Sequence, residues 1–349
     1  MTPPAPRSVA PPAAAAPAAA APAAAPGAAA APILLAIGGS AVLTVNDMAV
    51  KALSDAYPLH QVVLVRALIG MALVLALLAA TRGPRRMAEG IRTRRPGLHA
   101  LRVLCVLASN VLYFLGLAAM PLADGVALFF VAPLLLTALS GPLLGERVGW
   151  RRWTAVGTGL AGVLVLLRPG SGTLDPAALL VLGSALAYAL MHVLTRRLAP
   201  TDGPLAMSFW TQMGFLLVAC GMGLAAGDGH LAAGLENPSL RFLLRAWSWP
   251  AAGDWPFFLA TGLAVAVGGL MVSQAYRLGE AGLVAPFEYV AVPMGVLWGA
   301  VVFGTWPDAT AWTGIALIVG AGLYVIWRET RLGRKTTMAA PARGEGEAP

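Results

Sequence analysis

Residues 121–170 read PLADGVALFFVAPLLLTALSGPLLGERVGWRRWTAVGTGLAGVLVLLRPG, which is two apolar runs joined by the basic segment GERVGWRR (145–152). A helix rises about 1.5 Å per residue, so roughly 20 apolar residues cross a hydrocarbon layer of about 30 Å. Both runs are close to that length. The stretch therefore predicts two membrane-spanning helices with a basic loop between them.

The composition of the whole chain agrees with this reading. Of its 349 residues 58% are hydrophobic and 11% are charged, and the mean hydropathy is +0.75. A soluble domain carries about twice that share of charge. Glycine, which is common where membrane helices approach closely, recurs inside the apolar stretches. We expect an all-α polytopic membrane protein.

Apolar stretches of spanning length recur along the chain and predict ten transmembrane helices. They cover residues 32–53, 59–80, 98–118, 121–141, 152–169, 176–197, 205–227, 256–276, 281–303 and 310–328. The Ala/Pro-rich residues 1–31 are expected to be a disordered tail, because repeated proline breaks helices. Residues 329–349 are polar and are expected to form a cytoplasmic tail.

The distribution of Lys and Arg predicts the orientation. With a cytoplasmic N-terminus, 18 of these residues fall in inside segments and four in outside segments, while Arg66 and Arg102 fall within spans. Cytoplasmic loops of membrane proteins carry the excess of Lys and Arg. Both termini are therefore expected in the cytoplasm of a bacterium, with the chain in the inner membrane. This bias also accounts for the net charge of +8 without a nucleic-acid partner.

The two halves of the chain repeat one another. Equivalent residues lie 159 or 160 positions apart: Pro133 and Pro293, Gly145 and Gly304, Trp153 and Trp312, Arg168 and Arg328. Each half, residues 32–169 and 176–328, holds five spans, an odd number, so the two repeats must be inverted relative to each other. The basic loop at 145–152 matches GTWPDATA (304–311), which has no Lys or Arg. Inverted repeats are typical of secondary transporters with a substrate site near the membrane midplane.

Two segments, one in each half of the chain, resemble a known transporter family. Residues 121–170 and the segment APFEYVAVPMGVLWGAVVFGTWPDATAWTGIALIVGAGLYVIWRE (285–329) resemble the signature halves of EamA-type carriers in the drug/metabolite transporter superfamily. NDMAVKAL (46–53) and QVVLVRALIG (61–70), together with PFEY, resemble a branch that includes riboflavin and S-adenosylmethionine uptake carriers. The resemblance implies ten helices in two inverted five-helix repeats and transport of small metabolites. The chain departs from it at Thr305, where relatives often have Glu, and in the long segment 228–255.

Three charges in the first two spans are candidate transport residues. Asp47 and Lys51 share a helix face because they are four residues apart, and Asn46 lies beside them. Arg66 has about the same estimated depth, which predicts an Asp47–Arg66 pair within direct or one-water reach. Charges inside a membrane are by default functional hypotheses. The alternative is a structural clamp between the two helices, with Lys51 reaching outward.

Other polar residues fall inside later spans. Glu288 and Tyr289 lie between two prolines, where a carboxylate beside freed backbone carbonyls could bind a proton, a cation or a substrate amine. Asn110, His192 and Gln212 are also candidates, and the alternative for each is a hydrogen bond between helices.

Four aromatic residues and one loop helix have two interpretations each. Phe129, Phe130, Trp210 and Trp298 either stack on a flat substrate or pack between helices. The segment LRFLLRAWSW (240–249) is expected to be a short interfacial helix, with a gating lid as the alternative.

The function predicted from these features is secondary transport of a small polar metabolite across the inner membrane. The best guess is uptake of a vitamin or cofactor such as riboflavin, and the alternative is an efflux carrier for amino acids or related metabolites. A multi-pass enzyme or a receptor is disfavoured, since the sequence has no GxSxG motif and no metal-ligand spacing. Neither a metal nor a cofactor is expected. Without a GxxxxGK[ST] motif, transport is expected to run down a gradient or to couple to an ion, most simply H⁺.

Overall fold

The computed structural model describes residues 30–144, 150–167, 175–198, 201–278 and 287–338. Within these ranges every regular element is helical. The predicted N-terminal tail up to residue 29 and most of the basic loop at 145–152 lie outside the described residues.

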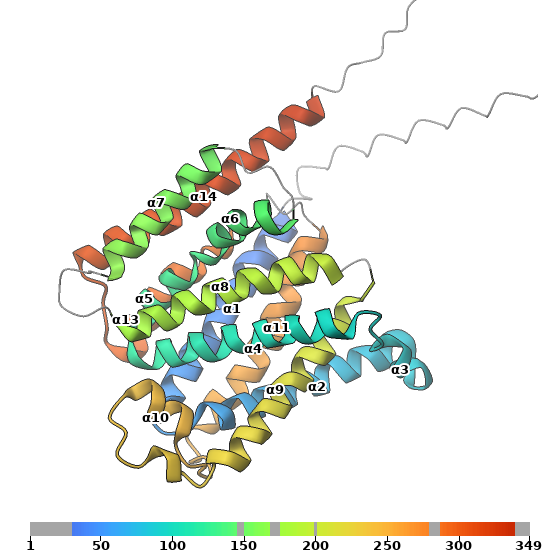
Figure 1. Ribbon diagram of the computed structural model, residues 1–349, viewed down its shortest axis with the longest axis vertical. Helices are drawn as coiled ribbons and strands as arrows, with labels where there is room; N and C mark the ends of the chain where they lie inside the picture. Colours follow the sequence, from blue (N-terminus) through green and yellow to red (C-terminus); the bar gives the residue numbers. More distant parts are fainter. Residues whose placement is uncertain (1–29, 145–149, 168–174, 199–200, 279–286, 339–349) are drawn as a thin grey trace, which may run out of the picture.

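The helices follow the predicted spans closely, and Figure 1 shows how they are arranged. The elements are α1 (Ala30–Leu53), α2 (Leu59–Arg82), η1 (Pro84–Arg86), α3 (Met87–Gly90), α4 (Pro96–Ala119), α5 (Leu122–Phe129), α6 (Ala132–Leu144), α7 (Trp150–Leu167), α8 (Pro176–Leu198), α9 (Pro204–Ala226), η2 (His230–Ala232), α10 (Pro238–Leu244), α11 (Trp255–Leu278), α13 (Ala291–Phe303) and α14 (Ala309–Met338).

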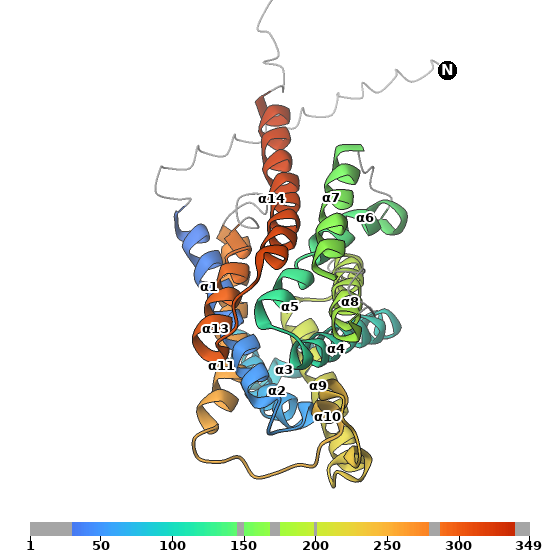
Figure 2. The same ribbon diagram turned by 90° about the vertical axis from the view of Figure 1, so that its left-hand side faces the viewer.

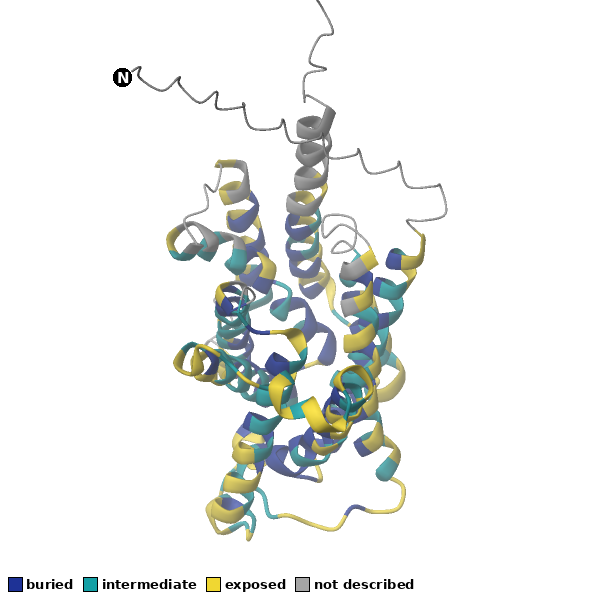
Figure 3. Ribbon diagram, turned by 90° about the vertical axis from the view of Figure 1, so that its right-hand side faces the viewer, coloured by how far each residue is buried: buried dark blue, intermediate teal, exposed yellow. Residues whose placement is uncertain are grey.

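Six of the described helices are long and apolar enough to cross a membrane, and four shorter stretches are apolar as well. The protein is thus an all-α, multi-pass membrane protein, and the count of ten spans stays a prediction. Figure 3 shows buried residues toward the middle of the bundle and exposed residues around it. Apolar side chains on that outer surface, such as Leu224 at 91% exposed and Val301 at 69%, suit a lipid-facing surface.

Two of the predicted spans are broken in equivalent places. The span predicted at 121–141 is split into α5 and α6 by a turn at Phe130, and the span at 281–303 has its turn at Tyr289 and Val290. Proline lies three or four residues further on in each case, at Pro133 and Pro293. Because proline has no N–H, it cannot bond the carbonyl four residues earlier. The prolines that mark the repeat therefore also explain the breaks.

The helix pairing has the symmetry expected of two repeats. The closest pairs are α1 with α11 and α4 with α8, and exchanging the two repeats converts the first pair into the second. The same exchange of repeats converts α2 into α9 and α7 into α14, so the pairs α2 with α9 and α7 with α14 stay the same. In Figure 2 α1, α11 and α13 form one group, and α4, α6 and α8 form another. Each group contains helices from both halves of the sequence.

Glycine permits the tightest of these pairings. A Cβ on Gly268 of α11 would lie 2.9 Å from the Gly39 carbonyl oxygen of α1, and one on Gly314 of α14 would lie 3.0 Å from the Gly162 oxygen of α7. Small residues let membrane helices approach until their backbones touch. The recurring glycines of the sequence are used in this way.

The long segment between α9 and α11 is fastened to the turn between α1 and α2. Tyr57 donates a hydrogen bond to Asp254 over 2.6 Å and accepts one from the Ala251 N–H. Gln61 exchanges two hydrogen bonds with the Ser248 backbone. The predicted helix at 240–249 is present as the shorter α10.

The last helix is longer than predicted. α14 continues to Met338, well past the expected end of the span at 328. The sequence RETRLGRKTTM has no proline and is rich in helix-forming Arg, Lys and Glu. It therefore extends the helix although it is too polar to belong to the span.

Candidate functional site

A cavity of about 460 Å³ lies where both repeats meet. It is lined by Ser40, Leu43, Thr44, Asn46, Asp47, Arg66, Arg102, Ser109, Asn110, Tyr113, Phe114, Val126, Phe129, Phe130, Tyr188, Ser208, Thr211, Gln212, Phe215, Val265, Glu288 and Ala291. Six of the nine predicted transport residues are among them: Asn46, Asp47, Arg66, Asn110, Gln212 and Glu288. Lys51, His192 and Tyr289 are not.

Arg66 is buried, at 6% exposed, and its contacts are neutral groups. Its Nη2 donates a short hydrogen bond to Asn110 Oδ1 on α4. The rings of Phe114 and Phe215 pack against the guanidinium, with their centroids 5.4 and 5.0 Å from its carbon. Cation–π contacts of this kind are strongest away from water. They hold the guanidinium in a fixed place in the cavity wall.

Asp47 is held by hydrogen bonds from neutral donors. Asn46 Nδ2 donates to it over 3.0 Å and the Tyr113 hydroxyl over 3.2 Å. Asp47 and Arg66 form no direct ion pair, but their charges interact electrostatically, and the one-water form of the predicted pair stays a prediction. The Arg66 side chain is bonded to Asn110 on α4 instead.

Lys51 has a structural position outside the cavity. Its Nζ donates to the carbonyl oxygens of Leu117 and Met120, each over 2.7 Å, and lies 5.5 Å from the ring centroid of Phe303. The last carbonyls of a helix have no partner within that helix, so Lys51 caps the end of α4. This contact joins α1 to α4, whereas the clamp interpretation placed the contact between the first two spans with Lys51 reaching outward.

Glu288 reaches the cavity at the break in the predicted ninth span. It is half-buried and interacts electrostatically with Tyr188 and Tyr289. Tyr289 itself is buried, with its ring centroid 4.9 Å from that of Phe130. It therefore supports the cavity wall from behind. His192 lies behind the wall in the same way, with its ring 4.4 Å from that of Tyr188.

Aromatic rings form a continuous band along one wall. They follow one another in the order Phe114, Tyr113, Phe129, Tyr188 and His192, with neighbouring centroids between 4.4 and 5.2 Å apart. Most of these pairs are edge-to-face or tilted, the geometry that aromatic pairs prefer. Of the four aromatic residues singled out in the sequence, Phe129 and Phe130 line the cavity. Trp210 and Trp298 instead donate to the Ile91 carbonyl and to Thr44.

Arg102 lines the cavity but is not among the predicted transport residues. Its Nε donates to Thr195 over 2.8 Å and its Nη1 to Thr211 over 3.1 Å. These threonines come from α8 and α9, so one side chain of the first repeat is bound by two helices of the second. The sequence feature that could have identified Arg102 as a cavity residue is its position inside a predicted span.

The sequence is similar to known membrane transporters. A model of the EamA-like transporter family matches residues 30–168. A riboflavin transporter of Rhizobium johnstonii is 31% identical over 245 residues, which cover 70% of this chain and 75% of that protein. The chain belongs to the EamA-like transporter family. It is therefore a carrier of small metabolites and not an enzyme, as the two signature segments predicted.

Further relatives of this EamA-like transporter extend the match over both repeats. A riboflavin transporter of Vibrio cholerae is 29% identical over 300 residues, 85% of this chain and 93% of that protein. A crystal structure with 21% identity has the same fold, with a TM-score of 0.58 over 85% of this chain and 97% of the other. These matches confirm the predicted family.

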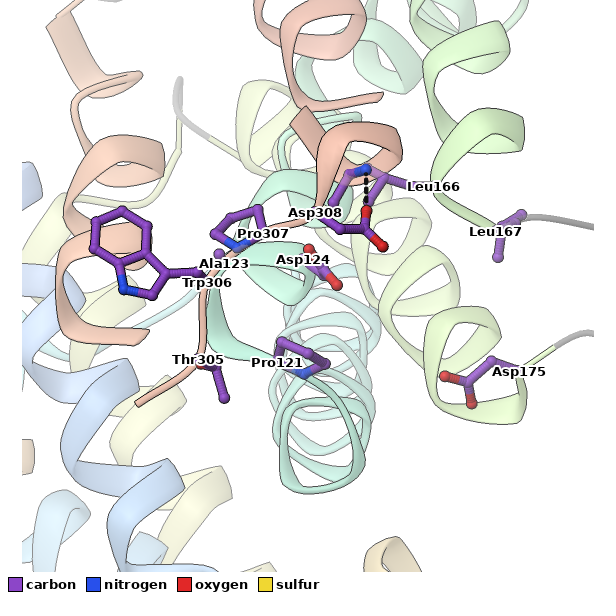
Figure 4. Close-up of a pocket in the computed structure, with 11 residues that line it drawn as sticks. Pro121, Ala123, Asp124, Leu166, Leu167, Asp175, Thr305, Trp306, Pro307 and Asp308 are labelled. Atoms are coloured by element: carbon purple, nitrogen blue, oxygen red, sulfur yellow. Dashed lines mark hydrogen bonds between the residues drawn. The ribbon is translucent and has the colours of Figure 1, made fainter. Parts of the chain in front are cut away.

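The EamA-like transporter has a second pocket, of about 390 Å³, which contains none of the predicted transport residues. Figure 4 shows three carboxylates around it, those of Asp124, Asp175 and Asp308. Asp308 accepts from the Ala311 N–H and Asp175 from the Ala177 N–H, both over 2.8 Å. Two of the three acids are thus helix caps. Thr305, where the chain departs from the family, lines this pocket and not the central cavity.

Proposed function

We propose that this EamA-like transporter takes up a small polar metabolite across the bacterial inner membrane, and that riboflavin is its substrate. The observation that carries the proposal is the band of aromatic rings beside the Arg66–Asn110 hydrogen bond. Riboflavin is a flat fused-ring system with polar edges and a hydroxylated side chain. Flat rings stack on aromatic side chains, and a few placed polar groups fix their orientation.

The charges of the cavity support a neutral substrate. Its lining holds two carboxylates, Asp47 and Glu288, and two guanidinium groups, Arg66 and Arg102. In their ionised forms these charges cancel. A polyanion such as a nucleotide would leave an excess of negative charge in a poorly hydrated site, which is costly. Riboflavin adds no charge.

The hydroxyl-bearing side chains of the cavity support a hydroxylated substrate chain. Ser40, Thr44, Ser109, Ser208 and Thr211 all line it. The hydroxyls of Thr44 and Thr211 donate to carbonyl oxygens of their own helices, so they offer the hydroxyls of a substrate chain acceptor oxygens. The riboflavin transporters among the relatives point to the same substrate.

Transport in proteoliposomes tests the substrate and the direction together. Vesicles of both orientations are loaded or bathed with riboflavin, S-adenosylmethionine and a panel of amino acids, and each flux is followed over time. We expect saturable riboflavin uptake driven by a gradient. Flux of an amino acid without any flux of riboflavin would replace the proposal with the alternative of an amino-acid exporter.

Proton coupling is proposed to run through Glu288. Glu288→Gln keeps the shape of the side chain and removes its titration, so transport should fall at least tenfold at normal protein levels. The pH dependence of the remaining flux should flatten. Glu236→Gln, the same change on an exposed loop residue, is the matched control and should leave both unchanged. Wild-type flux and pH dependence in Glu288→Gln would remove this carboxylate from the transport cycle.

The orientation of the chain is proposed from its Lys and Arg distribution, with both termini in the cytoplasm. Single cysteines at Ala88 in α3 and at Gly234 in the α9–α11 segment test it. A membrane-impermeant thiol reagent added to intact cells should modify the cysteine at Gly234 and not the one at Ala88. The reverse pattern would invert the topology.

A further inference from the structure

Asn46 carries an unpartnered acceptor in the cavity wall. The residue is 5% exposed and lines the central cavity. Its Nδ2 donates to Asp47 over 3.0 Å, but its Oδ1 has no hydrogen-bond partner among the described residues. A buried acceptor without a donor costs free energy. Such an atom at the edge of a binding cavity points to a donor on the ligand.

The orientation of this amide follows from its neighbour. A carboxylate accepts hydrogen bonds and does not donate them, whereas an amide has one end that donates and one that accepts. The NH₂ group of Asn46 must therefore face Asp47. Rotating the amide would bring two acceptor oxygens together. Oδ1 is consequently the end of the amide that has no partner among the described residues, on a side chain that lines the cavity.

Hydrogen-bond donors come from Arg66 in the same region. Arg66 and Asn46 line the same cavity, and Asn46 is hydrogen-bonded to Asp47 beside them. A guanidinium has five N–H donors in one plane, and the Asn110 bond takes one of them. Phe114 and Phe215 pack against the group, and in-plane donors remain for a ligand.

We propose that Asn46 and Arg66 together read an imide edge of the substrate, that is, a ring N–H beside a ring carbonyl. Asn46 Oδ1 accepts from the N–H, and Arg66 donates to the carbonyl oxygen. The aromatic band holds the flat ring that carries this edge. The inference rests on the proposed function, because riboflavin has such an edge, and it assigns Asn46 as the residue that selects for the N–H.

The test pairs a change in the ligand with a change in the protein. Binding of riboflavin and of its N3-methyl derivative, which lacks the imide N–H, is measured by flavin fluorescence with purified full-length protein. Losing a bond to a buried acceptor is expected to weaken wild-type binding about 5- to 150-fold. In Asn46→Leu the ratio between the two ligands should fall close to one.

Asn110→Leu is the matched control. It removes the partner of Arg66 and leaves Asn46 intact, so it should weaken the binding of both ligands while preserving most of the wild-type ratio. If Asn46→Leu does not fold, Asn46→Ala takes its place. A ratio near one in the wild type, or an unchanged ratio after Asn46 is replaced, overturns the inference. Wild-type protein that binds neither flavin overturns the proposed function instead.

Discussion

Replacing Lys51 by methionine should destabilise the protein and leave substrate binding nearly unchanged. Methionine has a similar length and fills the same space, but it cannot donate to the carbonyls of Leu117 and Met120. Hydrogen bonds from charged donors contribute about 1.5–3 kcal/mol each, and their contributions are not additive. Lys51 is half-buried, so burial of its ammonium offsets part of this gain. We expect a net loss of about 2–4 kcal/mol.

Thermal unfolding in detergent, followed by tryptophan fluorescence, measures the stability. Lys51→Met should unfold several degrees below the wild type. Lys51→Arg, which keeps the charge and the donors, should lose less. Riboflavin affinity of the folded fraction should change by less than about threefold in both variants, since Lys51 does not line the cavity.

A Lys51→Met protein with wild-type thermal stability and greatly weakened substrate binding would make Lys51 part of the transport site. The capping contact with α4 would then be incidental. Such an outcome would also restore the first interpretation of the NDMAVKAL segment, in which all of its polar residues face the substrate.

Two further predictions concern the cavity wall and the α9–α11 segment. Gly70→Ala should slow transport several-fold with little loss of stability. A Cβ at Gly70 would overlap Gln212 Nε2, and the flexible Gln212 side chain can move out of the way without shifting the helices, which displaces a residue of the cavity wall. An unchanged transport rate would contradict this prediction. Tyr57→Phe should speed amide exchange over residues 227–254 by about fivefold or more, since it removes the bonds to Asp254 and from Ala251. The bond to Asp254 raises the pKa of Tyr57 above its ordinary 10.0, so in the wild type this contact should persist at neutral pH. It should be lost only as the pH rises through that raised value. Exchange that quickens below pH 10 by more than the base-catalysed intrinsic rate would count against the assignment.

The sequence predicted the positions of the helices well because long apolar stretches bounded by polar residues and proline favour helices. Helix boundaries mostly differ from the predicted ones by one or two residues. The exceptions have local causes: proline splits two spans, and a polar helix-forming segment extends α14 to Met338. Pro133 and Pro293 were recognised as marks of the repeat, but the breaks they produce depend on the neighbouring backbone as well.

The cavity was predicted less completely because its geometry depends on helix rotation. Estimates of depth placed Asp47 and Arg66 at one level, but depth does not say which way each side chain faces. The partners of Arg102 lie 93 and 109 residues away in the chain, and those of Lys51 lie 66 and 69 residues away. No spacing rule relates such residues. Helical pairing must be known before these hydrogen bonds can be assigned.

The scaffold and the cavity differ in symmetry, and this difference matters for transport. The helix pairs and the two proline breaks obey the exchange of repeats, which suits the rocking of one repeat against the other in carriers of this architecture. The polar lining does not obey it. Asn46, Asp47 and Arg66 come from α1 and α2 of the first repeat, and Glu288 comes from the second. A substrate held among them would meet an amide, a carboxylate and a guanidinium on the side of the first repeat and the Glu288 carboxylate on the side of the second. We therefore expect the repeat to serve both access states, and we expect the unlike halves of the lining to contact different edges of the proposed flat-ring substrate.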